Sequence, residues 1–159
     1  MNEDPCINQY FQLGTKDREI HLNLSLKAVR IYFRKTNNYE EFSELITGNV
    51  TYEMAGKAGW CHMHPVTVKL AGPTDKGLIN FVVFCPMREI GFHSDHYKKN
   101  GEKTLIPGNE SAGCIRIPDR ESGRFFDLVQ NGDCVRIYKR PFWRSPTFAG
   151  CIQSEHCSL

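Results

Sequence analysis

The sequence predicts a mainly β fold, either a curled sheet or a β-sandwich, with one principal short helix in its last third. Three observations support this prediction. Several runs are rich in β-branched and aromatic residues, Gly, Pro and Asn clusters separate those runs at short spacing, and a single segment carries both helix-start and helix-stop signals.

The first half of the chain holds the clearest strand pattern. In residues 20–26 (IHLNLSL) the apolar residues occupy every second position, which places them on one face of a strand. Residues 28–34 form a second β-prone run, with a turn expected at 36–38. Residues 40–46 fit a short helix or a strand edge equally well, and 51–65 are predicted to form a loop over the sheet.

Further strands are expected in the second half. Residues 66–70 and 78–84 are β-prone and are separated by a turn at 71–77 that contains Gly-Pro and a second glycine. Residues 90–93 form a short strand that ends in a histidine.

The single helix is predicted from residue 118 to about residue 129. Asp119 and Glu121 put negative charge in its first turn, and Asn131-Gly132 ends it. Residues 134–138 form the last predicted strand.

Size and composition indicate one domain. A chain of 159 residues can bury a core without metal or disulfides, so we expect a single domain over 1–159, with its core at about 18–140 and a C-terminal tail at 141–159. The formal net charge of +2 argues against a nucleic-acid-binding polycation. The longest apolar stretch, residues 79–85, is too short for a membrane span.

Residues 111–116 (SAGCIR) have the features of a cysteine nucleophile site. A small residue and Gly113 before Cys114 let the backbone approach a substrate carbonyl, with the N–H groups of Gly113 and Cys114 as oxyanion donors. Arg116 favours the reactive thiolate, and His93 is the candidate base that takes the thiol proton. His96 is the alternative base; we prefer His93 because it ends a predicted strand.

His93, followed by a polar stretch and then Ser-x-Gly-Cys-Ile-Arg, resembles the signature of the L,D-transpeptidases. These cell-wall enzymes cross-link or trim peptidoglycan stem peptides through a thioester on cysteine. The resemblance covers about residues 81–138 and includes the predicted helix, turn and last strand. It implies the fold of that family, peptidoglycan stem peptides as substrate, and a transpeptidase or carboxypeptidase reaction without a cofactor.

The resemblance also suggests substrate-binding residues. Arg116 could bind a stem-peptide carboxylate or be a surface strand residue, and we favour the former because it lies beside the nucleophile. Ser111, Asp95 and Tyr97 are further candidates. Ser111 could instead bond only to local backbone, and Asp95 could cap a turn. The rival functions are a cysteine peptidase or amidase of other specificity, and a non-catalytic wall-binding module.

Two departures from the common family pattern concern the biological setting. Ser94-Asp95 follows the histidine where common members have glycine, and Ala112 stands where they often have histidine or a basic residue. His-x-Asp with Ser-x-Gly-Cys resembles a branch of toxins that type VI secretion delivers into rival periplasms, which implies secretion machinery and an immunity protein as partners. The oligomeric state is left open.

The expected place of action is the periplasm or cell wall, yet the start of the sequence has acids and no apolar core, unlike a signal peptide. Export by a non-classical route, a shortened chain and a cytoplasmic substrate are the three alternatives.

Seven cysteines make an odd number, and Cys114 is the one expected to stay unpaired. The other six could form up to three disulfides outside the cell or stay reduced in a cytoplasm, and Cys151 with Cys157 is the first pair to consider. Residues 61–64 (CHMH) could contribute metal ligands, but the paired Cys-x-x-Cys spacing of structural zinc sites is absent, so we expect no metal site.

Overall fold

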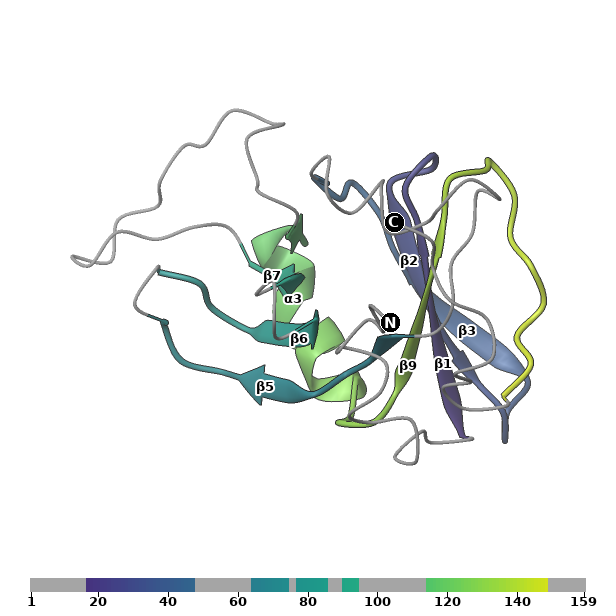
Figure 1. Ribbon diagram of the computed structural model, residues 1–159, viewed down its shortest axis with the longest axis horizontal. Coiled ribbons are helices and arrows are strands. Elements are labelled where there is room, and N and C mark those ends of the chain that lie inside the picture. The colour runs from purple at the N-terminus through teal and green to yellow at the C-terminus, as the bar shows by residue number, and fades with distance from the viewer. Residues whose placement is uncertain (1–16, 48–63, 75–76, 86–89, 95–113, 149–159) are drawn as a thin grey trace, which may run out of the picture.

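The computed structural model describes residues 17–47, 64–74, 77–85, 90–94 and 114–148 (Figure 1). The strands in this part of the chain are β1 (Arg18–Asn23), β2 (Ala28–Phe33), β3 (Asn38–Phe42), β4 (His64–Pro65), β5 (Val68–Leu70), β6 (Phe81–Cys85), β7 (Ile90–His93), β8 (Ile115–Arg116) and β9 (Cys134–Tyr138). Helix α3 (Asp119–Leu128) lies between β8 and β9 in the chain. The predicted mainly β fold with a helix after the cysteine is therefore confirmed.

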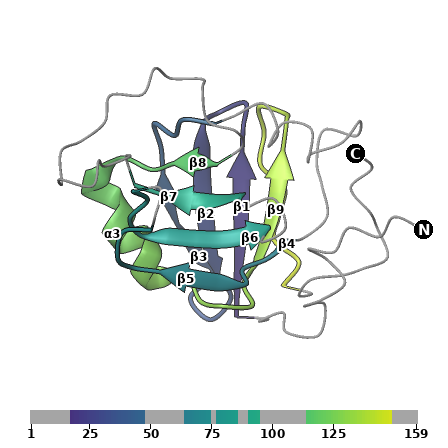
Figure 2. The ribbon, with the colours of Figure 1, turned by 60° about the vertical axis from the view of Figure 1, so that its left-hand side comes forward.

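The described strands form two mixed sheets. Sheet A has the order β3-β2-β1-β9-β4, and sheet B has the order β5-β6-β7-β8. β1 pairs with β9 in parallel, as β7 does with β8, and the other neighbours are antiparallel. Figures 1 and 2 show the two sheets as separate layers with α3 along one side, which favours the sandwich over the curled sheet.

The core lies between the two sheets because alternate residues of each strand face inward. On β1, Ile20 and Leu22 belong to the core cluster, while the intervening His21 faces the other side of sheet A. Phe125 of α3 joins the layers. Its ring packs on Phe42 of sheet A and on Phe92 of sheet B, at centroid distances of 5.3 and 4.7 Å.

Several sequence predictions about strands needed correction or completion. The strands predicted at 66–70 and 78–84 begin only at Val68 and Phe81, and His64–Pro65, at the end of the predicted loop, form β4. The alternation at 20–26 suggested a strand to residue 26, but β1 ends at Asn23 and residues 24–27 form a turn. The Oδ1 atom of Asn23 accepts a hydrogen bond from the backbone N–H of Leu26 at 3.0 Å, which stabilises the turn locally. The ambiguous 40–46 region contains the end of strand β3 and an isolated bridge at Ile46.

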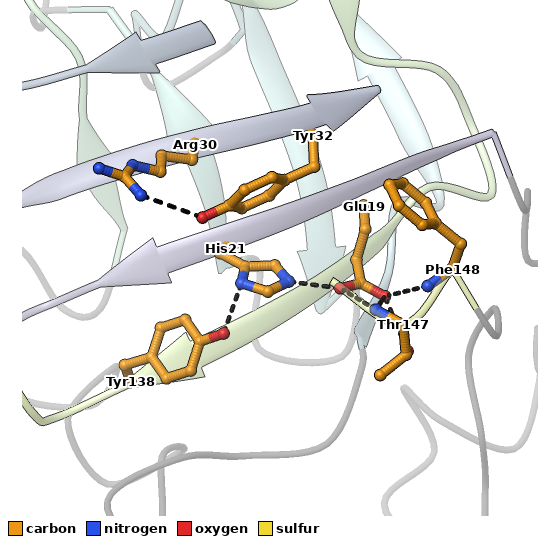
Figure 3. Close-up of polar contacts among 7 residues, drawn as sticks. All are labelled: Glu19, His21, Arg30, Tyr32, Tyr138, Thr147 and Phe148. Atoms are coloured by element: carbon orange, nitrogen blue, oxygen red, sulfur yellow. Dashed lines mark hydrogen bonds and ion pairs between the residues drawn. The ribbon is translucent and has the colours of Figure 1, made fainter. Parts of the chain in front are cut away.

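The segment after β9 runs along the side of sheet A that faces away from sheet B, as the yellow-green trace in Figure 1 shows. Figure 3 shows what holds it there. The carboxylate of Glu19 accepts hydrogen bonds from the backbone N–H and hydroxyl of Thr147 and from the N–H of Phe148. Its other partner is His21, which also bonds to the hydroxyl of Tyr138.

Two cysteines of the described strands, Cys85 on β6 and Cys134 on β9, are disulfide-bonded, whereas Cys114 is not in a disulfide. Cys151 and Cys157, where we expected a first pair, lie outside the described residues. No helix in the described ranges is long and apolar enough to cross a membrane.

Candidate active site

The pairing of β7 with β8 brings Cys114 and His93 to one face of sheet B. In this parallel pair Phe92 lies opposite Ile115, and both side chains belong to the core. Because side chains alternate along a strand, His93 on β7 and Cys114, directly before β8, lie on the opposite face. The described geometry therefore presents the thiol and the imidazole on the side of sheet B that faces away from the core.

Both residues contact the same apolar wall. Leu78, Phe81 and Val83 form a small buried cluster on this face of sheet B, and the partly buried Cys114 packs against it. The ring of Phe81 meets the imidazole of His93 edge-on, with centroids 6.0 Å apart and planes at 76°. The cluster thus lies beside both residues, with Phe81 in contact with the imidazole, and it lowers the exposure of each to water.

The hydrogen bond at Nδ1 of His93 fixes which tautomer the neutral ring adopts. The side chain is fully buried, and Nδ1 bonds to the backbone carbonyl oxygen of Ser94. A carbonyl oxygen only accepts, so Nδ1 carries the proton and donates it. The neutral imidazole then has its lone pair on Nε2, the arrangement that a general base requires.

The strand after the thiol is held from both sides. The N–H of Arg116 donates to the carbonyl oxygen of Ile46 at 2.8 Å, and the N–H of Ile46 donates back to Arg116 at 3.1 Å. On the other side, the N–H of Ile117 donates to the carbonyl oxygen of His93 at 2.8 Å. The backbone next to Cys114 is therefore tied directly to the backbone of His93.

Arg116 lies opposite His93 in the register of β7 and β8, so its side chain leaves the same face of the sheet. Only 3% of this side chain is exposed. A buried guanidinium two residues from the thiol supplies a fixed positive charge near the reactive group.

The other predicted site residues, Gly113, Ser111, Asp95 and Tyr97, lie outside the described residues, as do the alternative base His96 and the first three residues of the 61–64 motif. The structure therefore brings together Cys114, His93 and Arg116. Within the described ranges, no group of three or more His, Cys, Asp or Glu side chains is arranged to hold a metal ion.

Sequence reasoning missed the apolar wall and the glycine that makes room for it. A Cβ atom on Gly91 would lie 2.1 Å from the carbonyl oxygen of Val82 and 2.9 Å from Cε2 of Phe81. The sequence did contain a sign of the close packing at Gly91, because a glycine inside a strand, here between Ile90 and Phe92, often marks a place where another backbone approaches closely. The wall itself had no local signal, because Phe81 looks like any other core residue.

Similar folds occur in solved structures. The chain resembles a fused Zn-dependent amidase/peptidase/peptidoglycan-binding domain-containing protein from Clostridium acetobutylicum, with 19% identity, a TM-score of 0.55, and coverage of 77% of this chain and 52% of that one. It also resembles an L,D-transpeptidase from Stackebrandtia nassauensis, with 18% identity, a TM-score of 0.53, and coverage of 79% and 57%.

A third neighbour is Mycobacterium tuberculosis L,D-transpeptidase 1, with 14% identity, a TM-score of 0.52, and coverage of 76% of this chain and 60% of that one. The chain thus spans just over half the length of these neighbours, and the likeness concerns the fold. None of the curated proteins compared with the chain matches it.

A family model adds the sequence evidence. The YkuD model, which describes the L,D-transpeptidase catalytic domain, matches residues 17–137, the range that includes both sheets, α3, Cys114 and His93. The chain therefore belongs to the L,D-transpeptidase catalytic domain family.

Proposed function

We propose that this protein acts on peptidoglycan stem peptides as an L,D-transpeptidase or L,D-carboxypeptidase, with Cys114 as nucleophile and His93 as general base and acid. The observation that carries the proposal is the placement of a cysteine outside any disulfide and a histidine with its lone pair on Nε2 on one face of sheet B. Family membership supplies the substrate class.

The reaction divides into two acyl transfers. His93 takes the proton of the Cys114 thiol, and the thiolate attacks the carbonyl carbon that precedes the terminal D-amino acid of a donor peptide. When the tetrahedral intermediate collapses, the C–N bond breaks, and His93 returns the proton to the leaving amine. An acceptor amine then attacks the thioester to form a cross-link, or water attacks it to leave a shortened peptide.

Arg116 supports this chemistry by its charge. A buried guanidinium on the same face as the imidazole favours thiolate over thiol and suits a carboxylate of the donor peptide. The N–H groups of Gly113 and Cys114 are proposed as oxyanion donors, and Ser111, Asp95 and Tyr97 as substrate contacts.

The disulfides favour a place of action outside the cytoplasm. Cys85 and Cys134 are both disulfide-bonded, and such bonds persist mainly in oxidising compartments such as the periplasm or the cell surface. We therefore propose that the protein works in the periplasm or cell wall. Delivery by secretion machinery and binding by an immunity protein stay predictions from the His-x-Asp resemblance.

The test is incubation with purified tetrapeptide muropeptides and mass spectrometry of the products. Release of the terminal amino acid is expected, with dimers if transfer dominates and shortened monomers if hydrolysis dominates. Cys114→Ser should abolish both products, and His93→Ala should slow their formation by a factor of about 10² or more. Folding of the variants is checked by circular dichroism. A wild-type protein that leaves tetrapeptides unchanged and forms no dimers would contradict the proposal.

A further inference from the structure

The chain continues beyond the family domain with a segment rich in positive charge. The family match ends at residue 137, and residues 139–148 contain Lys139, Arg140 and Arg144 but no Asp or Glu. The whole chain, in contrast, has 20 Lys and Arg against 18 Asp and Glu. The charge excess after β9 is therefore local, and the segment that carries it is fixed to sheet A.

Trp143 fixes the orientation of this segment. Its indole contacts the ring of Tyr138 at a centroid distance of 6.2 Å, and the guanidinium of Arg30 lies 4.2 Å from its ring centroid. With Trp143 against sheet A, the flanking Phe142 and Arg144 are exposed. Phe142 is 48% exposed, so a large aromatic side chain projects from a fixed backbone into solvent.

The turn between β1 and β2 adjoins the same segment. Nδ2 of Asn23 donates to the carbonyl oxygen of Phe142 at 3.0 Å, while Oδ1 of Asn23 accepts from the N–H of Leu26, also at 3.0 Å. The hydroxyl of Ser25 donates to the carbonyl oxygen of Lys139. Leu26 is 43% exposed and is followed by the exposed Lys27. Asn23 thus links the backbones of Leu26 and Phe142, two residues whose apolar side chains are exposed.

Together these residues form a surface that we call the basic edge patch, made of Leu26, Lys27, Lys139, Arg140 and Phe142. Two carboxylates on this side of sheet A already have partners. Glu19 is buried and bound by Thr147 and His21, and Glu41 pairs with Arg30 at 2.7 Å. The cations of the patch therefore set the charge of its surface.

We propose that the basic edge patch binds the surface of an anionic lipid bilayer. Exposed Lys27 and Arg140, with the half-buried Lys139, lie beside exposed Leu and Phe side chains. This combination binds membrane interfaces, where the apolar tips enter the headgroup region and the cations attract anionic lipids. A purely charged polymer would bind to the cations, but such binding would not explain why two apolar side chains are exposed to solvent beside them. The inference is independent of the proposed reaction, because none of the patch residues belongs to the candidate active site.

The test is co-sedimentation of the full chain with vesicles of mixed phosphatidylcholine and phosphatidylglycerol, compared with vesicles of phosphatidylcholine alone. The wild-type protein should bind the anionic vesicles, and high salt should weaken this binding. Lys27→Gln with Arg140→Gln should weaken it about 30-fold, since each basic residue contributes about fivefold. Phe142→Ser should weaken it about tenfold through loss of apolar burial.

Arg34→Gln with Lys35→Gln is the matched control, because it removes two exposed cations from the turn at the opposite end of β1 and β2. This control and Cys114→Ser should bind as the wild type does, which separates the patch from the proposed chemistry. Thermal melts confirm that each variant is folded. Equal binding by the patch variant and the control would overturn the proposal. So would an effect of the cations without any effect of Phe142→Ser, because the attraction would then be purely electrostatic and the exposed apolar side chains would play no part in it.

Discussion

The ring of Phe81 meets the imidazole of His93 edge-on, with the two centroids 6.0 Å apart, and Cys114 packs against the same apolar cluster. The cluster that contains Phe81 thus contacts both members of the proposed dyad, and its aromatic ring keeps water from one side of the imidazole. Phe81 is therefore a positioning residue, since it holds the imidazole, within the cluster that contacts the thiol, without taking part in the chemistry.

Replacing Phe81 tests this role. Phe81→Leu should slow alkylation of Cys114 at neutral pH by up to about tenfold, because an aromatic pair is worth about 0.5–1.5 kcal/mol beyond its buried area. Iodoacetamide labelling of Cys114 followed by mass spectrometry measures the rate. The control is Phe84→Leu on the same strand, where the ring packs into the core against Phe92. It should lower stability but leave the labelling rate unchanged, and equal slowing in both variants would refute a local role for Phe81.

Gly91 is predicted to tolerate no side chain. Its added Cβ would lie 2.1 Å from the carbonyl oxygen of Val82, so Gly91→Ala must push β6 and β7 apart. We expect a loss of about 3 kcal/mol in the free energy of unfolding, measured by urea denaturation.

Gly123→Ala is the control for that substitution. Nothing lies within 4 Å of its added Cβ, and the residue is inside α3, where alanine should stabilise the helix by about 0.5–1 kcal/mol. A Gly91→Ala protein as stable as the wild type would show that the two strands do not approach as closely as described.

The Glu19–His21 pair should make the domain sensitive to acid. Burial raises the pKa of Glu19, but the hydrogen bond and charge of His21, with Arg136 and Thr147, outweigh it and hold that pKa below 4.5. Burial lowers the pKa of His21 below 6.5, although Glu19 opposes the shift. As the pH falls below about 6.5, His21 takes up a proton in the unfolded chain before it does so in the native protein, and below about 4.5 Glu19 behaves in the same way. Because the unfolded chain then binds more protons, the free energy of unfolding decreases as the pH falls.

Glu19→Gln tests this prediction. It should lower the free energy of unfolding at neutral pH by about 2 kcal/mol, since hydrogen bonds to a buried charge are lost. It should also make the decrease of the melting temperature below pH 5 shallower than in the wild type. Asp127→Asn, on the exposed side of α3, should leave the pH profile unchanged. An unchanged acid profile in Glu19→Gln would contradict the assigned role of the pair.

The sequence allowed prediction of those elements whose signals are local. The strand at 134–138 and the helix after Pro118 were found with nearly the observed bounds, because alternation, first-turn acids and an Asn-Gly stop act over a few residues. Strand β3 was ambiguous because it is an edge strand with exposed Glu41, so pairing with β2, rather than its own pattern, decides its conformation.

The site was predictable to a similar extent. Cys114 and His93 stood out by residue type and context, but their common contact with the cluster of Leu78, Phe81 and Val83 depends on the pairing of β6, β7 and β8 across distant parts of the chain. The sequence also contained no local indication that the segment after β9 packs against sheet A. Glu19 alternates on β1 like any polar surface residue, and only the fold reveals that Thr147 and Phe148 bury it.

The most direct test of the proposed chemistry is the mass of the intact protein after brief incubation with a stem tetrapeptide and an acid quench. A thioester predicts a mass increase equal to the mass of the tetrapeptide minus the mass of the released terminal amino acid, mapped by digestion to Cys114 and absent from Cys114→Ser. His93→Ala should form the adduct far more slowly, by a factor of about 10² or more. If the wild-type protein shortens or cross-links the peptide while Cys114→Ser does so equally well and no adduct forms, Cys114 is not the nucleophile.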